Sequence, residues 1–199
     1  EGAVRNVTVA GTPPEDDQTG IDFSQVTEFT VANSSVQGSG AVRTTGIGAT
    51  QSWNVTVAEN DVTPAGGSAI QLTLARNAEV TGNDVSDGDT GIGVYIVGGN
   101  RVANNTVTGF DVGIVLSEAK GNNLADNRIE SSGQGVVLRG VSDGNSFAGT
   151  QITNADTGFD VVDSTDIVVE NATVDGTDTA VSLTGKGYIA DPPTTYPSG

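Results

Sequence analysis

Apolar and polar positions alternate along the chain in short segments that recur at a nearly fixed distance. Each unit opens with an apolar residue, two variable residues, a small polar residue, one more residue and a second apolar residue, as in VANSSV from Val31 and VANNTV from Val102. A second signature of the form Gly-Ile-x-Val follows, as in TGIGV around Gly91. Period-two alternation without any i, i+3, i+4 apolar stripe predicts short β-strands and excludes helical repeats.

Consecutive units extend this pattern over nearly the whole chain. They start 22, 26, 23, 22, 22, 23 and 22 residues apart, at Val9, Val31, Val57, Val80, Val102, Leu124, Phe147 and Val169. A unit of this length cannot bury its apolar face alone and must stack on its neighbours. The spacing therefore predicts a β-solenoid.

The apolar-x-x-Asn-x-apolar step followed by Gly-Ile-x-Val resembles the parallel β-helix repeat of the pectate-lyase-like superfamily, including its carbohydrate-binding and sugar-hydrolase repeat domains. The resemblance covers about residues 4–185. It implies an all-β, right-handed, single-stranded parallel β-helix of about eight coils with three short strands per coil. We expect this β-helix over residues 1–186 and an extended tail or linker, containing Pro and Thr, over 187–199. The same coil occurs in lyases, glycosidases, epimerases and adhesins, so the fold implies no one activity.

The small polar position of the repeat predicts an internal ladder of side chains. Asparagine tolerates the left-handed conformation of a tight turn, and its amide both donates and accepts hydrogen bonds along a stack of coils. The ladder is expected to run out toward the C-terminus, where Thr150 and Ala172 take the position. Its predicted members are Asn60, Asn83, Asn105 and Asn127.

The composition restricts the partners and the surroundings of the protein. The chain has 25 acidic and 8 basic residues, a net charge of −17 and no cysteine or histidine. Such a charge repels nucleic acids and anionic membranes, and no apolar run is long enough to span a bilayer. An acidic, lysine-poor surface resembles that of proteins from extreme halophiles, particularly haloarchaea. We expect an extracellular or cell-surface protein, or part of a viral particle, in high salt; an ordinary acidic secreted domain is the alternative.

Four aspartates share one position of the repeat, two residues before the second signature. They are Asp89, Asp111, Asp156 and Asp178. Stacked carboxylates repel one another, so they are either separated by the turns or share a cation such as Ca²⁺. Aspartate two residues before a glycine is also a common turn former, and we favour turn formation over a calcium site. No other cofactor is expected.

An active site would lie on an outer face of the solenoid. Arg139 and Asp160, one coil apart, are the only basic and acidic neighbours that the repeat places there, and a surface ion pair is the favoured interpretation. Gly93, Val115 and Val137 form an outward apolar stripe, bordered by Tyr95 and Val162. It is a candidate surface for a partner chain or ligand, and scattered exposed valines on a β-face are the alternative. Trp53 could stack on a sugar ring, but its alternation with Val55 and Val57 favours core or rim packing.

Glycosylation sequons of the form Asn-x-Ser/Thr would suit a surface glycoprotein. They occur at Asn6, Asn33, Asn54, Asn104 and Asn171. Three of the asparagines, Asn33, Asn104 and Asn171, share one position of the repeat, beside the predicted ladder.

Two functions follow from these observations. The first is a non-catalytic, extracellular structural or adhesive module of a surface or fibre protein, with glycan binding as one option. Its partners would be other chains, other domains of a longer chain, or a polysaccharide. The second is a carbohydrate-active enzyme, a polysaccharide lyase or glycoside hydrolase, acting on an outer face. The absence of histidine and the negative charge favour the first.

Overall fold

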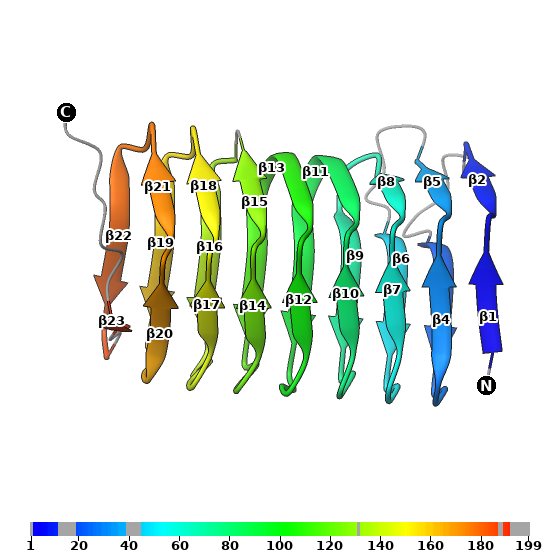
Figure 1. Ribbon diagram of the computed structural model, residues 1–199, viewed down its shortest axis with the longest axis horizontal. Coiled ribbons are helices and arrows are strands. Elements are labelled where there is room, and N and C mark those ends of the chain that lie inside the picture. The colour runs from blue at the N-terminus through cyan, green and yellow to red at the C-terminus, as the bar shows by residue number, and fades with distance from the viewer. Residues whose placement is uncertain (1, 12–18, 39–44, 131, 187–188, 192–199) are drawn as a thin grey trace.

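The computed structural model describes residues 2–11, 19–38, 45–130, 132–186 and 189–191. These residues form 23 strands and no helix. Figure 1 shows them as a rod of stacked coils, which the chain follows from β1 at one end to β22 and β23 at the other. No helix long and apolar enough to cross a membrane occurs in this described part.

Each coil contributes strands to three parallel sheets. The first sheet contains β1 (Gly2–Arg5), β4 (Phe29–Ala32), β7 (Thr56–Ala58), β10 (Glu79–Thr81), β12 (Arg101–Ala103), β14 (Asn123–Ala125), β17 (Ser146–Ala148), β20 (Ile167–Glu170) and β23 (Ile189–Asp191). The second contains β2 (Thr8–Ala10), β5 (Ser35–Gln37), β8 (Asp61–Thr63), the first part of β11 (Asp84–Tyr95) and of β13 (Thr106–Ser117), β15 (Arg128–Glu130), β18 (Gln151–Thr153) and β21 (Thr173–Asp175). The third contains β3 (Thr19–Ser24), β6 (Thr45–Thr50), β9 (Ser68–Thr73), the remainder of β11 and β13, β16 (Gln134–Arg139), β19 (Thr157–Val162) and β22 (Thr179–Thr184).

The sheets are parallel because each strand pairs with its equivalent one coil away. Val80 pairs with Val102, for example, and Ile92 with Ile114. The long strands β11 and β13 run through both the second and third sheets and join them. The fold is therefore the predicted parallel β-solenoid with three strand segments per coil. Pairing continues into β23, which joins β20 beyond the predicted domain boundary at residue 186.

Inward side chains of equivalent strands stack into apolar columns that fill the rod. In the middle coils these side chains are fully buried, as at Val107 and Ile114. One predicted stack is wrong: Val9 pairs with Val36 in the second sheet, and Val4, not Val9, pairs with Val31 in the first. The first unit therefore starts at Val4, and its VRNVTV matches VANSSV with valine in place of the small polar residue.

The four asparagines predicted as a ladder lie buried at the corner between the first and second sheets. Asn60 Nδ2 donates to Asn83 Oδ1 at 2.9 Å, Asn83 Nδ2 to Asn105 Oδ1 at 2.9 Å, and Asn105 Nδ2 to Asn127 Oδ1 at 3.0 Å. The residue before each of them has a positive φ, which turns the chain into the next strand. Thr150 ends the ladder with a buried hydroxyl that has no partner in the described residues.

A second ladder, not predicted from the sequence, lies where each coil re-enters the first sheet. Ala78 N donates to Asn100 Oδ1 at 2.9 Å, Asn100 N to Asn122 Oδ1 at 3.0 Å, and Asn122 N to Asn145 Oδ1 at 2.8 Å. Each of these three asparagines is buried and follows a glycine with a positive φ. Two polar stacks thus satisfy the backbone at the turns of the rod.

Candidate functional site

The corner that leads from the third sheet back to the first has a common structure in successive coils. Two residues with positive φ stand three positions apart, as at Gln51 (φ 49°) and Asn54 (φ 51°). The residue just before the second of them, here Trp53, points its side chain away from the core. The left-handed conformation costs a non-glycine residue some free energy. It recurs at the same two positions in successive coils, so the residue before the second position is in register from coil to coil. That exposed position is occupied in successive coils by Thr27, Trp53, Arg76, Gly98, Lys120, Asp143 and Thr165, and we name it the corner column.

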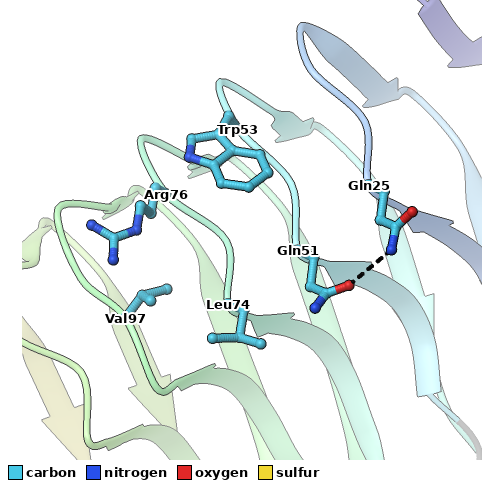
Figure 2. Close-up of a pocket in the computed structure, with 6 residues that line it drawn as sticks. All are labelled: Gln25, Gln51, Trp53, Leu74, Arg76 and Val97. Atoms are coloured by element: carbon cyan, nitrogen blue, oxygen red, sulfur yellow. Dashed lines mark hydrogen bonds between the residues drawn. The ribbon is translucent and has the colours of Figure 1, made fainter.

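Trp53 projects from the corner column beside an open groove. Its side chain is 45% exposed, and bridge pairing aligns it with Thr27 on one side and Arg76 on the other. Figure 2 shows the indole above a groove of about 520 Å³ lined by Gln25, Gln51, Trp53, Leu74, Arg76 and Val97. Of the two positions expected for Trp53, the core and the rim, the structure shows the rim, because strand alternation does not continue through the two left-handed residues of the corner.

Polar and apolar groups share this groove. Gln25 Nε2 donates to Gln51 Oε1 at 3.1 Å, so exposed amides line its edge. Further along the corner, Ile96 and Val141 are 50% and 49% exposed and border a second hollow with Lys120. Three of the five large exposed apolar side chains among the described residues therefore lie along this one corner, which is the kind of cluster that marks a binding surface.

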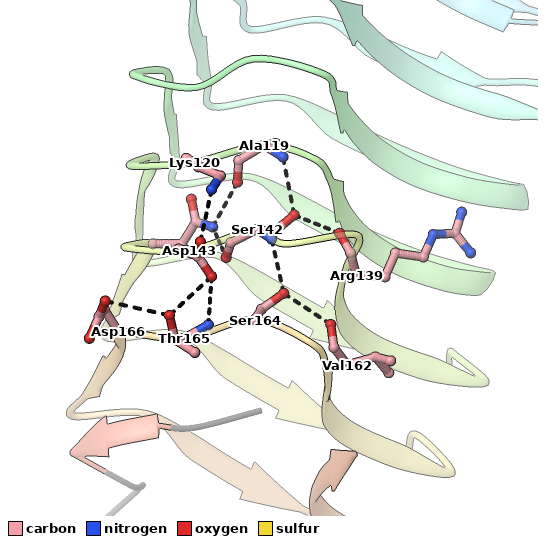
Figure 3. Close-up of polar contacts among 10 residues, drawn as sticks. Ala119, Lys120, Arg139, Ser142, Asp143, Val162, Ser164, Thr165 and Asp166 are labelled. Carbon is pink, nitrogen blue, oxygen red and sulfur yellow. Dashed lines mark hydrogen bonds and ion pairs between the residues drawn. The ribbon is translucent and has the colours of Figure 1, made fainter. Parts of the chain in front are cut away.

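Hydrogen bonds hold the corner column in place toward the C-terminal end (Figure 3). Asp143 accepts from Lys120 Nζ at 2.9 Å, from Thr165 N at 2.8 Å and from Thr165 Oγ1 at 3.1 Å. The hydrogen bond from Lys120 is the largest of several effects that lower the pKa of the Asp143 carboxyl. Lys120 remains largely exposed despite this contact.

The outer face of the third sheet carries Arg139 and Asp160, the candidate pair, but the structure does not bring the two side chains together. Asp160 pairs in register with Val137 and accepts a hydrogen bond from Gln134 Nε2 at 3.0 Å. Arg139 lies in the neighbouring column, beside Ser117. No ion pair between Arg139 and Asp160 occurs within the described ranges, so the predicted surface ion pair is not formed.

Tyr95 lies flat on this face. A Cβ at Gly93 would overlap the Tyr95 ring, so the glycine provides the space that the ring occupies. The phenol hydroxyl forms hydrogen bonds with the side chains of Ser68 and Thr90. Burial raises the pKa of Tyr95, while the charge of Arg139 and the two hydrogen bonds lower it by less.

Titration of Tyr95 is expected to give a pKa above its ordinary value of 10.0. Arg139→Gln should raise the pKa further, because the positive charge favours phenolate. Since the folded state holds the proton more tightly, stability should fall as pH rises above 10.0. NMR of ring-labelled tyrosine measures the pKa directly, with Asp160→Asn as a control on the same face. A pKa that falls in Arg139→Gln would contradict this arrangement.

The apolar stripe that was predicted to be exposed is buried. Val115 and Val137 lie on the outer face but are only 3% and 5% exposed. The side chains of the neighbouring coils and of the neighbouring positions on the same strand are close enough to bury them, without a second sheet or loop packed on this face. Val162 and Tyr95 are half-buried. The prediction that these valines form an exposed surface is therefore wrong.

The fold has counterparts among known families and structures. The model of the family described as "Right handed beta helix region" matches residues 2–109 and 45–190. These two matches together cover most of the chain. The chain belongs to the right-handed beta helix family. A search of curated proteins found no match.

Solved structures similar to this right-handed β-helix protein include two epimerases and a DFA-IIIase. The mannuronan C-5 epimerase AlgE4 A-module of Azotobacter vinelandii has a TM-score of 0.75 and 13% identity, with 94% of this chain and 58% of that chain covered. The DFA-IIIase of Arthrobacter chlorophenolicus A6 has a TM-score of 0.68 and 15% identity, with 87% and 45% covered. The periplasmic alginate epimerase AlgG has a TM-score of 0.64 and 18% identity, with 83% and 46% covered. The chain thus spans about half the length of these enzymes, and at this identity the likeness shows the fold alone.

The four candidate metal ligands of this β-helix stand one per coil. Asp89 and Asp111 are adjacent, because their flanking residues pair in register, whereas Gly133 separates Asp111 from Asp156. Asp178 lies next to Asp156, since Thr157 pairs with Thr179. Within the described residues no group of three or more acidic side chains is close enough to hold a metal ion. Turn formation stays the favoured interpretation of this column, and a calcium site stays the alternative.

All five sequon asparagines of this β-helix are exposed and have a positive φ. Four of them, Asn6, Asn33, Asn104 and Asn171, stand at the corner of the first ladder, and Asn54 stands at the corner of Trp53. The next residue is the turn position, which is buried in four of the five cases and exposed at Val7, and the one after it is a serine or threonine that opens a strand. The sequons thus coincide with turn positions of the coil, and glycosylation stays a prediction.

Proposed function

We propose that this β-helix is a non-catalytic carbohydrate-binding module of an extracellular surface or fibre protein, and that it binds sugar at the corner of Trp53. The exposed indole of Trp53 beside the groove is the observation that supports this proposal. A sugar ring has an apolar face that packs on an indole, and hydroxyls that exchange hydrogen bonds with amides such as Gln25 and Gln51.

The location of the groove favours carbohydrate binding without catalysis. Binding at the corner requires only a platform and hydrogen-bonding groups, and the groove supplies both. On the sheet face, by contrast, Asp160 is engaged by Gln134 and Arg139 lies in a different column. The similar structures include mannuronan and alginate epimerases, which supports carbohydrate as the ligand class.

The setting of the module is proposed from its charge. A net charge of −17 with only two lysines suits a protein that stays soluble in concentrated salt, where electrostatic screening is strong. We propose other chains, or other domains of a longer chain, as its structural partners.

Trp53→Ala is expected to weaken carbohydrate binding at least about tenfold, since stacking on an aromatic ring contributes about 1.5 kcal/mol. Trp53 is the only tryptophan of the chain, so its fluorescence reports binding at this site directly. A panel of oligosaccharides is titrated into the wild type, and glycan-array binding compares Trp53→Ala with Leu183→Ala, which removes an exposed apolar side chain elsewhere. Equal binding by Trp53→Ala and wild type would refute the proposal.

A carbohydrate-active enzyme is the second candidate. It is favoured by the likeness to epimerases and by Tyr95, which lies near Arg139 on an outer face. The pKa of Tyr95 is raised, and its hydroxyl is hydrogen-bonded. Incubation with polysaccharides, followed by detection of reducing or unsaturated ends, distinguishes the two functions. Activity that Arg139→Ala abolishes would establish the enzyme.

A further inference from the structure

A third hollow adjoins the Trp53 groove, shares Trp53 and Arg76 with it and adds the charge of Lys120. Its volume is about 650 Å³, and it extends from Trp53 and Arg76 to Lys120 across a floor of Gly98, Gly99 and Gly121. Arg76 and Lys120 stand in the corner column two coils apart, with Gly98 between them. We name this hollow the glycine notch.

The backbone itself keeps the notch open. A Cβ at Gly98 would overlap the backbone carbonyl of Lys120, so no other residue fits this position of the corner column. Gly99 and Gly121 have φ values of 76° and 62°, which glycine adopts at least cost. The space between the two cations is thus a fixed feature of the coil.

The charge of the notch is opposite to that of the chain. Only 8 of the 199 residues are basic, yet two of them face one hollow. No ion pair of Arg76 occurs in the described part of the chain, and Lys120, although bonded to Asp143, keeps a side chain that is 57% exposed. Such a pair of available cations predicts an anionic ligand.

We propose that the glycine notch binds the carboxylate of an acidic sugar, so that the ligand of this module is a uronate-containing glycan lying along the rod axis. This inference rests on the proposed carbohydrate binding at Trp53. The planar guanidinium of Arg76 matches a carboxylate with two parallel hydrogen bonds. Two coils rise by about 10 Å, so a glycan stacked on Trp53 and running along the corner reaches both Arg76 and Lys120.

The net charge of the protein opposes an anionic ligand at long range. At 0.15 M salt, however, the Debye length is about 8 Å, so carboxylates on the other faces of the rod are largely screened. The contact with Arg76 is direct and is screened much less. A short oligosaccharide at this ionic strength therefore responds mainly to the notch.

Fluorescence of Trp53 tests the inference with two ligands of equal length, an oligogalacturonate and a neutral cello-oligosaccharide. We expect the intact protein to bind the oligogalacturonate at least about tenfold more tightly. Arg76→Gln should remove about tenfold of that affinity and Lys120→Gln somewhat less. Lys120 does not line the Trp53 groove, so Lys120→Gln should leave the affinity for the neutral ligand unchanged, whereas Arg76→Gln should weaken the neutral ligand less than the oligogalacturonate. Arg101→Gln is the matched control, because Arg101 lies in β12 and is paired with Glu79.

The outcomes separate this inference from the proposed function. Equal affinity for both ligands, or unchanged oligogalacturonate binding in Arg76→Gln, would overturn the acidic ligand and leave carbohydrate binding intact. Binding of neither ligand would overturn both. Circular dichroism of each variant verifies that the coil is retained.

Discussion

Val107→Asp is expected to unfold the solenoid. Val107 is fully buried and stacks between Val85 and Ile129 in the middle of the rod. An unpaired carboxylate at this position costs several kcal/mol, against a total stability of about 5–15 kcal/mol for an ordinary domain. Because each coil contacts only its neighbours, a defect in the centre also separates the rod into two shorter stacks with newly exposed strand edges.

Thr106→Asp provides the matched control for Val107→Asp. Thr106 is the preceding residue of β13 and points outward. A carboxylate there lies between Asp84 of the preceding coil and Arg128 of the next, whose opposite charges offset each other. Circular dichroism and thermal unfolding compare the two variants. We expect Thr106→Asp to melt within a few degrees of the wild type and Val107→Asp to lack a cooperative transition. A cooperative transition of Val107→Asp near that of the wild type would show that the apolar columns are not what holds the coils together.

The repeat predicts the fold because burial in a solenoid follows strand alternation directly. Each coil repeats the same inward positions, so Val107 and Ile114 could be assigned from spacing alone. The error at Val9 has a local cause: the first unit has Val7 where later units have a small polar residue, which hides the true start at Val4. The second ladder also had a signal, because Asn100, Asn122 and Asn145 each follow glycine.

The site was harder to predict, since alternation gives the direction of a side chain and not its exposure. Val115 and Val137 point outward as predicted, yet the strands on either side bury them. For Trp53 alternation could not decide between core and rim, because Gln51 and Asn54 are left-handed and interrupt the alternation before Val55. The groove further depends on side chains 22 to 26 residues apart, such as Gln25 and Gln51, which only the register of the coils brings together.

Asn105→Leu is expected to destabilise the protein by about 3 kcal/mol or more. The variant leaves the backbone N–H and the amide of Asn83 without their acceptor and the carbonyl of Val80 without its donor. Each buried group left unpaired costs about 1–3 kcal/mol. Urea unfolding measures the loss, and Asn123→Ala, which removes an exposed asparagine of the first sheet, is expected to stay within about 0.5 kcal/mol of the wild type. Equal stability of the two variants would show that the ladder does not stabilise the stack.

Asn105→Asp distinguishes the hydrogen bonds of the ladder from simple packing, because the side chain keeps its shape. Its carboxylate still accepts from Asn83 but faces the carbonyl of Val80 and Oδ1 of Asn127, both acceptors. A protonated carboxyl can donate to one of them, so the folded pKa should lie above the unfolded value of about 3.9. The variant should therefore approach the stability of the wild type at pH values below this unfolded pKa and lose stability as pH rises through the folded pKa. A difference from the wild type that does not depend on pH would assign the loss to packing and not to the missing donor.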